Sequence, residues 1–251
     1  MIEVRNIKKS FGDKEVLKGI SAVFLQGKTN MIIGSSGTGK SVLLKCIVGL
    51  IPPTEGNVLF NDRDFYNSGK EIQKEIRQEI GMLFQSSALF DSKSVEQNVR
   101  FPLDMLSKLS DAEKTERVEY YLDRVGLTGS EDKMPSEISG GMQKRVGIAR
   151  AIVMKSQYLF CDEPNSGLDP QTATIIDNLI QEITHEYNLT TVVVSHDMNS
   201  MLEIGENIIF MSKGYKVWEG SADDINSADS EELDQFIFSN KLMRKYKAGE
   251  I

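Results

Sequence analysis

The feature that most constrains this chain is a glycine-rich stretch between an apolar run and a helix-like segment. Residues 34–41 read Gly-Ser-Ser-Gly-Thr-Gly-Lys-Ser, with Met31–Ile33 before them and Val42–Val48 after them. A glycine, four residues and then Gly-Lys-Ser between a strand and a helix is the phosphate-binding P-loop. Glycines let successive backbone N–H groups face one anion, and the following helix adds its unpaired N–H groups. The stretch therefore predicts a nucleotide phosphate site.

The side chains that end this loop predict how the phosphates are held. Lys40 is expected to supply a positive charge to the β- and γ-phosphates, and the Ser41 hydroxyl is expected to ligate Mg²⁺. The residues expected to line the phosphates through their backbone are Gly34, Ser35, Ser36, Gly37, Thr38 and Gly39. The alternative is a Gly/Ser-rich turn with no ligand, which the terminal Gly-Lys-Ser disfavours.

Composition limits the class of protein. The 251 residues, 40% of them hydrophobic, suffice for one α/β domain with a sizeable core and a small insertion. The net charge of −8 argues against broad nucleic-acid binding. We see no apolar run of the roughly 20 residues needed to cross a bilayer and no signal-peptide layout at Met1, so we expect a cytoplasmic protein. Cys46 and Cys161 lie in apolar runs and are predicted to be core residues.

Hydrophobic patterning predicts α/β structure interrupted by a helical insertion. Strand-like runs occur at Ile2–Ile7 and Val16–Leu25, with Phe11 in the turn between them, whereas residues from about 88 to 153 show little strand signal. Within that insertion, Ser94 and Ser110 each open a capping box, in which a hydroxyl and a side chain three residues later bond the first N–H groups of a helix. We therefore expect an α/β core over residues 1–220, with a helical subdomain at about 88–153.

The last 31 residues form a predicted helical extension, residues 221–251. Acidic residues come first and basic residues follow, which suits a helix dipole. The early acids are Asp223, Asp224, Asp229, Glu231, Glu232 and Asp234, and the late bases are Lys241, Arg244, Lys245 and Lys247. A solvated terminal helix is the simpler interpretation, and a docking tail for a partner or a second subunit is the alternative.

A second chemical signal is a pair of acids at the end of an apolar run. Tyr158–Cys161 is followed directly by Asp162 and Glu163. If that run is a strand, its carboxyl end lies at the edge where open α/β sheets bind ligands. Asp162 could then hold Mg²⁺, and Glu163 could polarise a water for attack on the γ-phosphate. Acids at a strand end are common by themselves, and it is the P-loop that makes this pair specific.

Three further runs complete a family resemblance. Residues 139–143 read Ser-Gly-Gly-Met-Gln, residues 162–169 read Asp-Glu-Pro-Asn-Ser-Gly-Leu-Asp, and residues 195–197 read Ser-His-Asp. They resemble the signature loop, the Walker B motif with D-loop, and the H-loop of ABC-transporter ATPases, in the family's order. The resemblance implies an α/β P-loop NTPase of the ABC ATPase type, with a mixed sheet and an inserted α-helical subdomain. Met142 departs from the family's usual glutamine, but it removes no phosphate ligand.

The resemblance also implies roles for particular residues. Phe11 resembles the aromatic that stacks on adenine, Gln85 resembles the Q-loop glutamine that contacts Mg²⁺, and His196 resembles the residue that contacts the γ-phosphate. In the family, a loop like Ser139, Gly140 and Gly141 faces the γ-phosphate held by the opposite subunit, and a residue like Asp169 contacts across the same interface. The expected cofactors are thus ATP and Mg²⁺, shared in a head-to-tail homodimer, with catalysis expected from Glu163, His196 and Lys40.

Sub-family features favour one kind of transporter. Four stretches are similar to the ATPases of Mla/MCE phospholipid transport systems: residues 34–45, 84–91, 99–103 and 139–145. That similarity implies an integral membrane permease, an MCE-domain lipid-binding protein as a further partner, and a position on the inner face of the cell membrane. Two alternatives stay open: a transporter of another substrate, and an ABC ATPase without a permease, such as the iron–sulfur assembly type.

Overall fold

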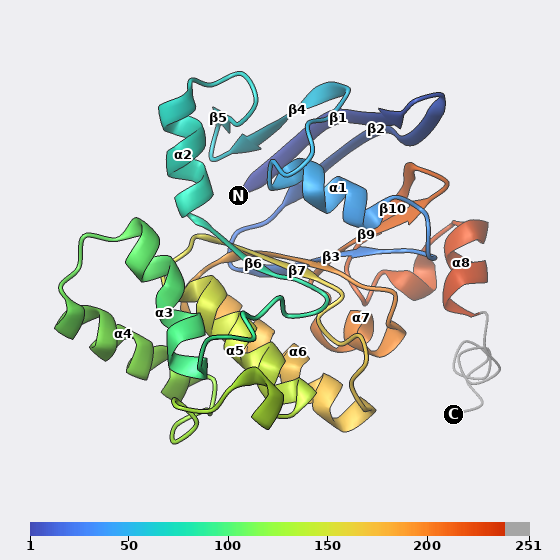
Figure 1. Ribbon diagram of the computed structural model, residues 1–251. Helices are drawn as coiled ribbons and strands as arrows, with labels where there is room; N and C mark the ends of the chain where they lie inside the picture. Colours follow the sequence, from blue (N-terminus) through green and yellow to red (C-terminus); the bar gives the residue numbers. More distant parts are fainter. Residues whose placement is uncertain (239–251) are drawn as a thin grey trace. The chain divides into compact units, whose positions relative to one another are not determined.

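The computed structural model describes residues 1–238, which separate into two compact units (Figure 1). The first unit comprises residues 1–25 and 29–68 and the described residues from 194 onward, and the second comprises residues 26–28 and 69–193. Acids of the predicted extension, Glu231, Glu232 and Asp234, lie in the first turn of helix α8 (Glu231–Ile237). The bases Lys241, Arg244, Lys245 and Lys247 lie outside the described residues.

The first unit contains an antiparallel sheet in the order β2-β1-β4-β5. Its strands are β1 (Ile2–Phe11), β2 (Lys14–Phe24), β4 (Glu55–Phe60) and β5 (Arg63–Asp64). The prediction that the first strand ends at Ile7 was wrong, because pairing continues through bulges to Phe11 opposite Lys14. Phe11 therefore ends a strand, and the turn is Gly12 and Asp13.

The same unit holds the strand and helix on either side of the glycine-rich loop. β3 (Lys28–Ile33) runs parallel to β9 (Asn207–Ser212), which pairs antiparallel with β10 (Tyr215–Gly220), so the sheet is mixed as expected. The helices of the unit are α1 (Lys40–Ile47), α7 (Met198–Ile204) and α8, with a 3-10 turn at Ile225–Ser227. Residues 34–39 thus connect a buried strand directly to a helix.

Parallel strands form the centre of the second unit. β6 (Ile80–Leu83) pairs parallel with β7 (Tyr158–Asp162), and β8 (Thr190–Val194) lies next to β7. Every residue of β7 and β8 is buried, as expected where helices cover both faces of a parallel sheet. Asp162 is the last residue of β7, so the acid pair does lie at the carboxyl end of a strand.

Helices make up most of the second unit. They are α2 (Lys70–Gln78), α3 (Val95–Leu106), α4 (Asp111–Arg124), α5 (Gly140–Ile152) and α6 (Pro170–Glu186), with a 3-10 turn at Pro135–Glu137. α3, α4 and α5 pack against one another (Figure 1). Both predicted capping boxes are confirmed: Ser94 and Ser110 accept from the N–H groups of Gln97 and Glu113.

Across residues 1–238, no helix is long and apolar enough to cross a membrane. Cys46 and Cys161 are fully buried free thiols, which confirms their prediction as core residues.

Candidate functional site

The glycine-rich loop passes so close to neighbouring backbone that two of its glycines are required. At Gly34 φ is +144°, and an added Cβ would lie 2.2 Å from the carbonyl oxygen of Met211. At Gly39 φ is +102°, and an added Cβ would lie 2.8 Å from Leu17 Cδ2. Side chains rarely adopt such positive φ angles, and neither position has room for one. The sequence of the loop is therefore dictated by its fold as well as by any ligand.

Lys40 folds back over the loop that precedes it. Its ammonium donates to the carbonyl oxygen of Gly34 at 2.7 Å and of Ser35 at 3.1 Å, and the residue is only 6% exposed. Thr38 Oγ1 also donates to the Ser35 carbonyl, at 2.9 Å. Because a buried charge is costly unless it is hydrogen-bonded, these bonds hold the ammonium at the loop. A positive charge is thus fixed beside the N-terminus of α1, which is an anion-binding arrangement.

Two more predicted residues belong to the same unit as the loop. Ser195 N–H donates to the carbonyl of Ile32, near the end of β3, at 3.2 Å. His196 follows Ser195 directly and is exposed, so this bond brings it close to the strand that leads into the loop. Phe11 is 49% exposed at the end of β1, and the Lys9 ammonium lies 5.0 Å from its ring centroid. An exposed aromatic ring of this kind can stack on a flat ligand.

The end of β7 has an unusual backbone. Asp162 is 8% exposed, and Glu163, the next residue, has φ of +51°. A left-handed conformation at a residue other than glycine costs free energy and is concentrated at functional sites. The chain then turns, with Ser166 N–H donating to the Glu163 carbonyl at 3.2 Å. The acid pair is therefore held at the carboxyl edge of the strand by a defined turn.

The second unit also brings Gln85 to this turn. Gln85 follows β6 by two residues, and its Nε2 donates to Ser166 Oγ at 3.1 Å. Lys144, in α5, donates to the Gln85 carbonyl oxygen. The sequence predicted a role for Gln85 but not its bonds with Ser166 and Lys144. These two residues lie in or next to the predicted motifs, but only the contacts between distant segments show that they hold Gln85.

Two helix N-termini meet at the predicted signature loop. Ser139 is the N-cap of α5, and its Oγ accepts from Met142 N–H at 3.3 Å. Asp169 is the N-cap of α6, and its carboxylate accepts from Thr172 N–H at 3.0 Å and from Thr172 Oγ1 at 2.6 Å. An added Cβ at Gly141 would lie 2.5 Å from Thr172 Cγ2, so the two helices start side by side. The bonds from Thr172 lower the pKa of Asp169. Ser139 and Gly140 are exposed, leaving their end of α5 open to an outside anion.

The predicted residues thus divide between the two units. Phe11, residues 34–41 and His196 belong to the first, and the second holds Gln85, residues 139–141, residues 162–163 and Asp169. Within the described part of the chain, no group of three or more His, Cys, Asp or Glu side chains could by itself hold a metal ion.

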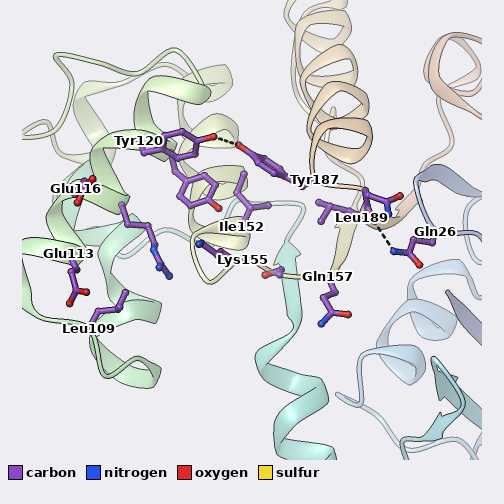
Figure 2. Close-up of a pocket in the computed structure, with 14 residues that line it drawn as sticks. Gln26, Leu109, Glu113, Glu116, Tyr120, Ile152, Lys155, Gln157, Tyr187 and Leu189 are labelled. Carbon is purple, nitrogen blue, oxygen red and sulfur yellow. Dashed lines mark hydrogen bonds between the residues drawn. The ribbon is translucent and has the colours of Figure 1, made fainter.

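A cavity of about 800 Å³ in the second unit contains none of these residues. Figure 2 shows its lining, in which the hydroxyls of Tyr120 and Tyr187 lie 3.0 Å apart and Gln26 donates to the carbonyl of Asn188. Gln157 and Leu189, which also line it, directly precede β7 and β8. The cavity is therefore at the amino ends of these strands. Open α/β sheets bind ligands at the carboxyl ends, so this cavity is not the predicted nucleotide site.

Comparison with known proteins identifies the family. The ABC transporter family model matches residues 17–166, which is more than half of the chain. A probable ribonucleotide transport ATP-binding protein of Mycobacterium leprae is 36% identical over 241 residues, covering 96% of this chain and 70% of that protein. The chloroplastic protein trigalactosyldiacylglycerol 3 of Arabidopsis thaliana is 37% identical, covering 94% and 73%. A methionine import ATP-binding protein of Clostridioides difficile is 36% identical, covering 97% and 75%.

Solved structures agree with this assignment. CbiO1 from Clostridium perfringens, part of an ABC transporter complex, superposes with a TM-score of 0.84 at 31% identity, covering all of this chain and 98% of that one. A dimeric ATP-binding cassette bound to ADP and phosphate after hydrolysis superposes with a TM-score of 0.79 at 30% identity, covering 88% and 99%. With its P-loop, mixed sheet and helices in this arrangement, the chain belongs to the ABC transporter family and is an ATP-binding, ATP-hydrolysing subunit of that family.

Proposed function

We propose that this subunit hydrolyses ATP at the predicted residues and so drives the transport of phospholipid through a separate membrane permease. The observation that carries the ATPase site is the buried Lys40 ammonium, fixed over the loop carbonyls beside the N-terminus of α1. In this role, residues 34–39 bind phosphate through backbone N–H groups, and Lys40 contacts the β- and γ-phosphates. Phe11 stacks on the adenine, and His196 contacts the γ-phosphate.

Mg²⁺ is the cation we assign to this site. Mg²⁺ is commonly held by one or two carboxylates together with substrate phosphates, so a site need not have a complete cage of protein ligands. Asp162, nearly buried at a strand end, and the Ser41 hydroxyl suit that role, and Gln85 adds a neutral oxygen. The bound ion would neutralise charge on the phosphate oxygens during phosphoryl transfer.

Glu163 is our candidate for the general base. It follows Asp162 directly and is held in a left-handed conformation by the turn to Ser166. A carboxylate there can orient a water and accept its proton as the water attacks the γ-phosphate. Glu163→Gln removes this ability while keeping the shape of the side chain, which makes it the direct test of the catalytic proposal.

The subunit acts, in this proposal, as a homodimer. ABC transporter ATPases act as dimers with membrane permeases, and a related cassette was solved as a dimer. The exposed N-cap Ser139 and Gly140, at the start of α5, offer N–H groups to a phosphate bound by the second copy. Asp169, also exposed and adjacent to that loop, makes its contact at the same interface.

An apolar hollow between β6 and α3, at the edge of the proposed helical subdomain, is the surface we assign to the permease. The hollow encloses about 290 Å³ and is lined by Phe84, Phe90, Phe101 and Leu106, with Arg77 and Arg150 also in the lining. Phe90 is 40% exposed and Leu106 50% exposed, so the apolar lining reaches the surface. This exposed apolar lining favours an apolar cytoplasmic segment of the permease. Docking there would place the subunit at the inner face of the membrane.

Phospholipid is the substrate we favour. Residues 84–91 and 99–103, which the sequence relates to Mla/MCE systems, provide Phe84, Phe90 and Phe101 to the hollow assigned to the permease. One relative is named after a glycerolipid, trigalactosyldiacylglycerol. An MCE-domain lipid-binding protein is the further partner this proposal requires.

Methionine import is the second candidate, because relatives named for it match the chain about equally well. One of them is 40% identical over 230 residues. A reconstituted complex of the ATPase with the permease that co-purifies from native membranes separates the candidates. Phospholipid transfer that needs ATP and is lost in Glu163→Gln supports the proposal. ATP-dependent methionine uptake without lipid transfer would replace it, and a soluble scaffold instead of a permease would point to the iron–sulfur assembly type.

A further inference from the structure

One face of α5 holds the chain segment that begins at Gln85. Lys144 donates to the Gln85 carbonyl, and Arg150 donates to the carbonyl of Ser87 at 2.6 Å and of Ala88 at 2.8 Å. At 3.6 residues per turn, Lys144 and Arg150 fall within about 120° of each other on the helix, with Gly147 midway between them. Residues 85–88 form a turn, in which Ser87 N–H donates to the Phe84 carbonyl at 2.8 Å. The two donors on α5 therefore hold this turn at its start and at its end.

Gly147 allows this segment to approach the helix. An added Cβ there would lie 2.6 Å from Leu83 Cδ1 and 3.7 Å from Ser87 Cβ. The segment itself is strained, because Ser87 has φ of +59° and Ala88 has φ of +47°. Non-glycine residues hold such angles only where the surroundings impose them. Arg150 supplies that constraint, since its guanidinium donates to the carbonyls of both residues.

Arg150 extends the connection to the hollow assigned to the permease. Its guanidinium carbon lies 5.9 Å from the centroid of the Phe90 ring, which lines that hollow and is 40% exposed. Burial lowers the pKa of Arg150, and a guanidinium remains charged even so. At the other end of the segment, the Gln85 side chain is bonded to Ser166, three residues after Glu163. Residues 85–90 thus contact the turn after β7 through Gln85, the helix α5 through Lys144 and Arg150, and the hollow through Phe90.

We propose that Lys144 and Arg150 are positioning residues, which fasten residues 85–88 to α5 so that movement at its Ser139 end reaches the hollow at Phe90. This inference rests on the proposed function, which assigns the partner subunit's nucleotide to Ser139 and the permease to the hollow. Lys144 and Arg150 act through the backbone of the segment. Removing their donors frees the two strained residues to relax, and Gln85 moves with them.

Hydrogen exchange and steady-state kinetics on the full chain test this inference. In Arg150→Met, exchange of the Ser87 and Phe90 amides, which donate to the Phe84 carbonyl and to Asn98 Oδ1, should be at least about tenfold faster than in the wild type. The kcat for ATP should fall about tenfold to a hundredfold, because the reacting groups are misplaced. KM should stay within about twofold, because the glycine-rich loop and Lys40, which hold the phosphates, are unchanged. Arg150→Lys keeps a charged donor and should recover part of both losses.

Arg145→Met is the matched control. Arg145 lies on the same helix, is similarly half-buried, and also donates to two backbone carbonyls, those of Val125 and Gly126. It should leave exchange in residues 85–90 and the kcat within about twofold of wild type. Equal effects of Arg145→Met and Arg150→Met would mean a general loosening of α5, and they would overturn the inference. So would unchanged exchange in Arg150→Met.

If Arg150→Met does not fold, Arg150→Lys and Lys144→Met are measured in the same way. Wild-type exchange at Ser87 and Phe90 in both variants would overturn the inference. The exchange measurement needs no nucleotide, so it is independent of the proposed function. A wild-type protein without ATPase activity would refute the proposed function and leave the exchange result standing.

Discussion

Replacing Lys40 by methionine isolates the charge that the fold holds at the glycine-rich loop. Methionine keeps most of the length of the side chain and removes the ammonium, which now bonds the carbonyls of Gly34 and Ser35 at 2.7 and 3.1 Å. Since Lys40 is 6% exposed, the folded chain has already met most of the cost of burying this charge. Lys40 would therefore offer the phosphate oxygens a donor that is already in position. Its removal should mainly weaken the binding of ATP.

The size of the effect follows from the bond that is lost. A hydrogen bond to a charged group contributes about 1.5–3 kcal/mol, so the dissociation constant for ATP should rise about ten- to a hundred-and-fifty-fold. Folding should change less than binding, because methionine packs in the same space and the Ser35 carbonyl is exposed to water. Only the buried Gly34 carbonyl is left without this partner, at a cost of about 1 kcal/mol. We expect the melting temperature to stay within about 4 °C of wild type, which corresponds to about 1 kcal/mol in a chain of this size.

Isothermal titration with ATP and Mg²⁺ measures this change. The matched control is Lys45→Met, which removes an ammonium from the last turn of the same helix, α1. The control should bind ATP within about twofold of wild type, because a charge at that end of the helix acts only within its own turn. Wild-type affinity in Lys40→Met would refute the assignment of Lys40, and an equal loss in Lys45→Met would show a non-specific effect of net charge.

Three further predictions concern catalysis, the loop after β6 and the thiols. Glu163→Gln should bind ATP but hydrolyse it at least about a hundredfold more slowly, and ATP should make it dimeric by light scattering; normal turnover would remove Glu163 from its role. Asn98→Leu should lower the free energy of unfolding, measured in urea, by about 3–5 kcal/mol, because the fully buried amide accepts from the Phe90 N–H and donates to the carbonyls of Phe90 and Lys93. A decrease of less than about 1 kcal/mol would contradict this. Burial raises the pKa of Cys46 to about 11 and also raises that of Cys161, so only about one Cys46 thiol in a thousand is ionised at pH 8. Alkylation at pH 8 should therefore be slow in the native protein and fast after unfolding. Rapid alkylation of the native protein would contradict this prediction.

Features that depend on neighbours in the chain were predictable from the sequence. The capping boxes at Ser94 and Ser110 were confirmed, as was the strand that places the acid pair at its carboxyl end. Each depends on a side chain and a backbone group only a few residues apart, or on an apolar run followed by a polar residue. The family could also be recognised, because its motifs are short and occur in a fixed order.

Features that depend on distant segments were missed or misplaced. Phe11 was expected in a turn, but pairing of β1 with β2 through bulges extends the strand to it. The bond from Gln85 to Ser166 joins residues 81 apart, and no local pattern indicates it. The left-handed conformation of Glu163 was likewise unpredicted, because its residue type does not favour that conformation and only the surrounding turn imposes it.

The sequence by itself determined the chemistry: a lysine and a serine after a glycine-rich loop, an acid pair after a buried strand, and the family to which they belong. Only the tertiary structure decided which of these elements touch and what holds them. It set Lys144 and Arg150 of α5 against the backbone of residues 85–88, and it left Phe90 exposed beside them. The physical reason is that a motif is defined by residue types at short spacing. A contact between a helix and a loop some 60 residues away depends on how both pack against the rest of the unit.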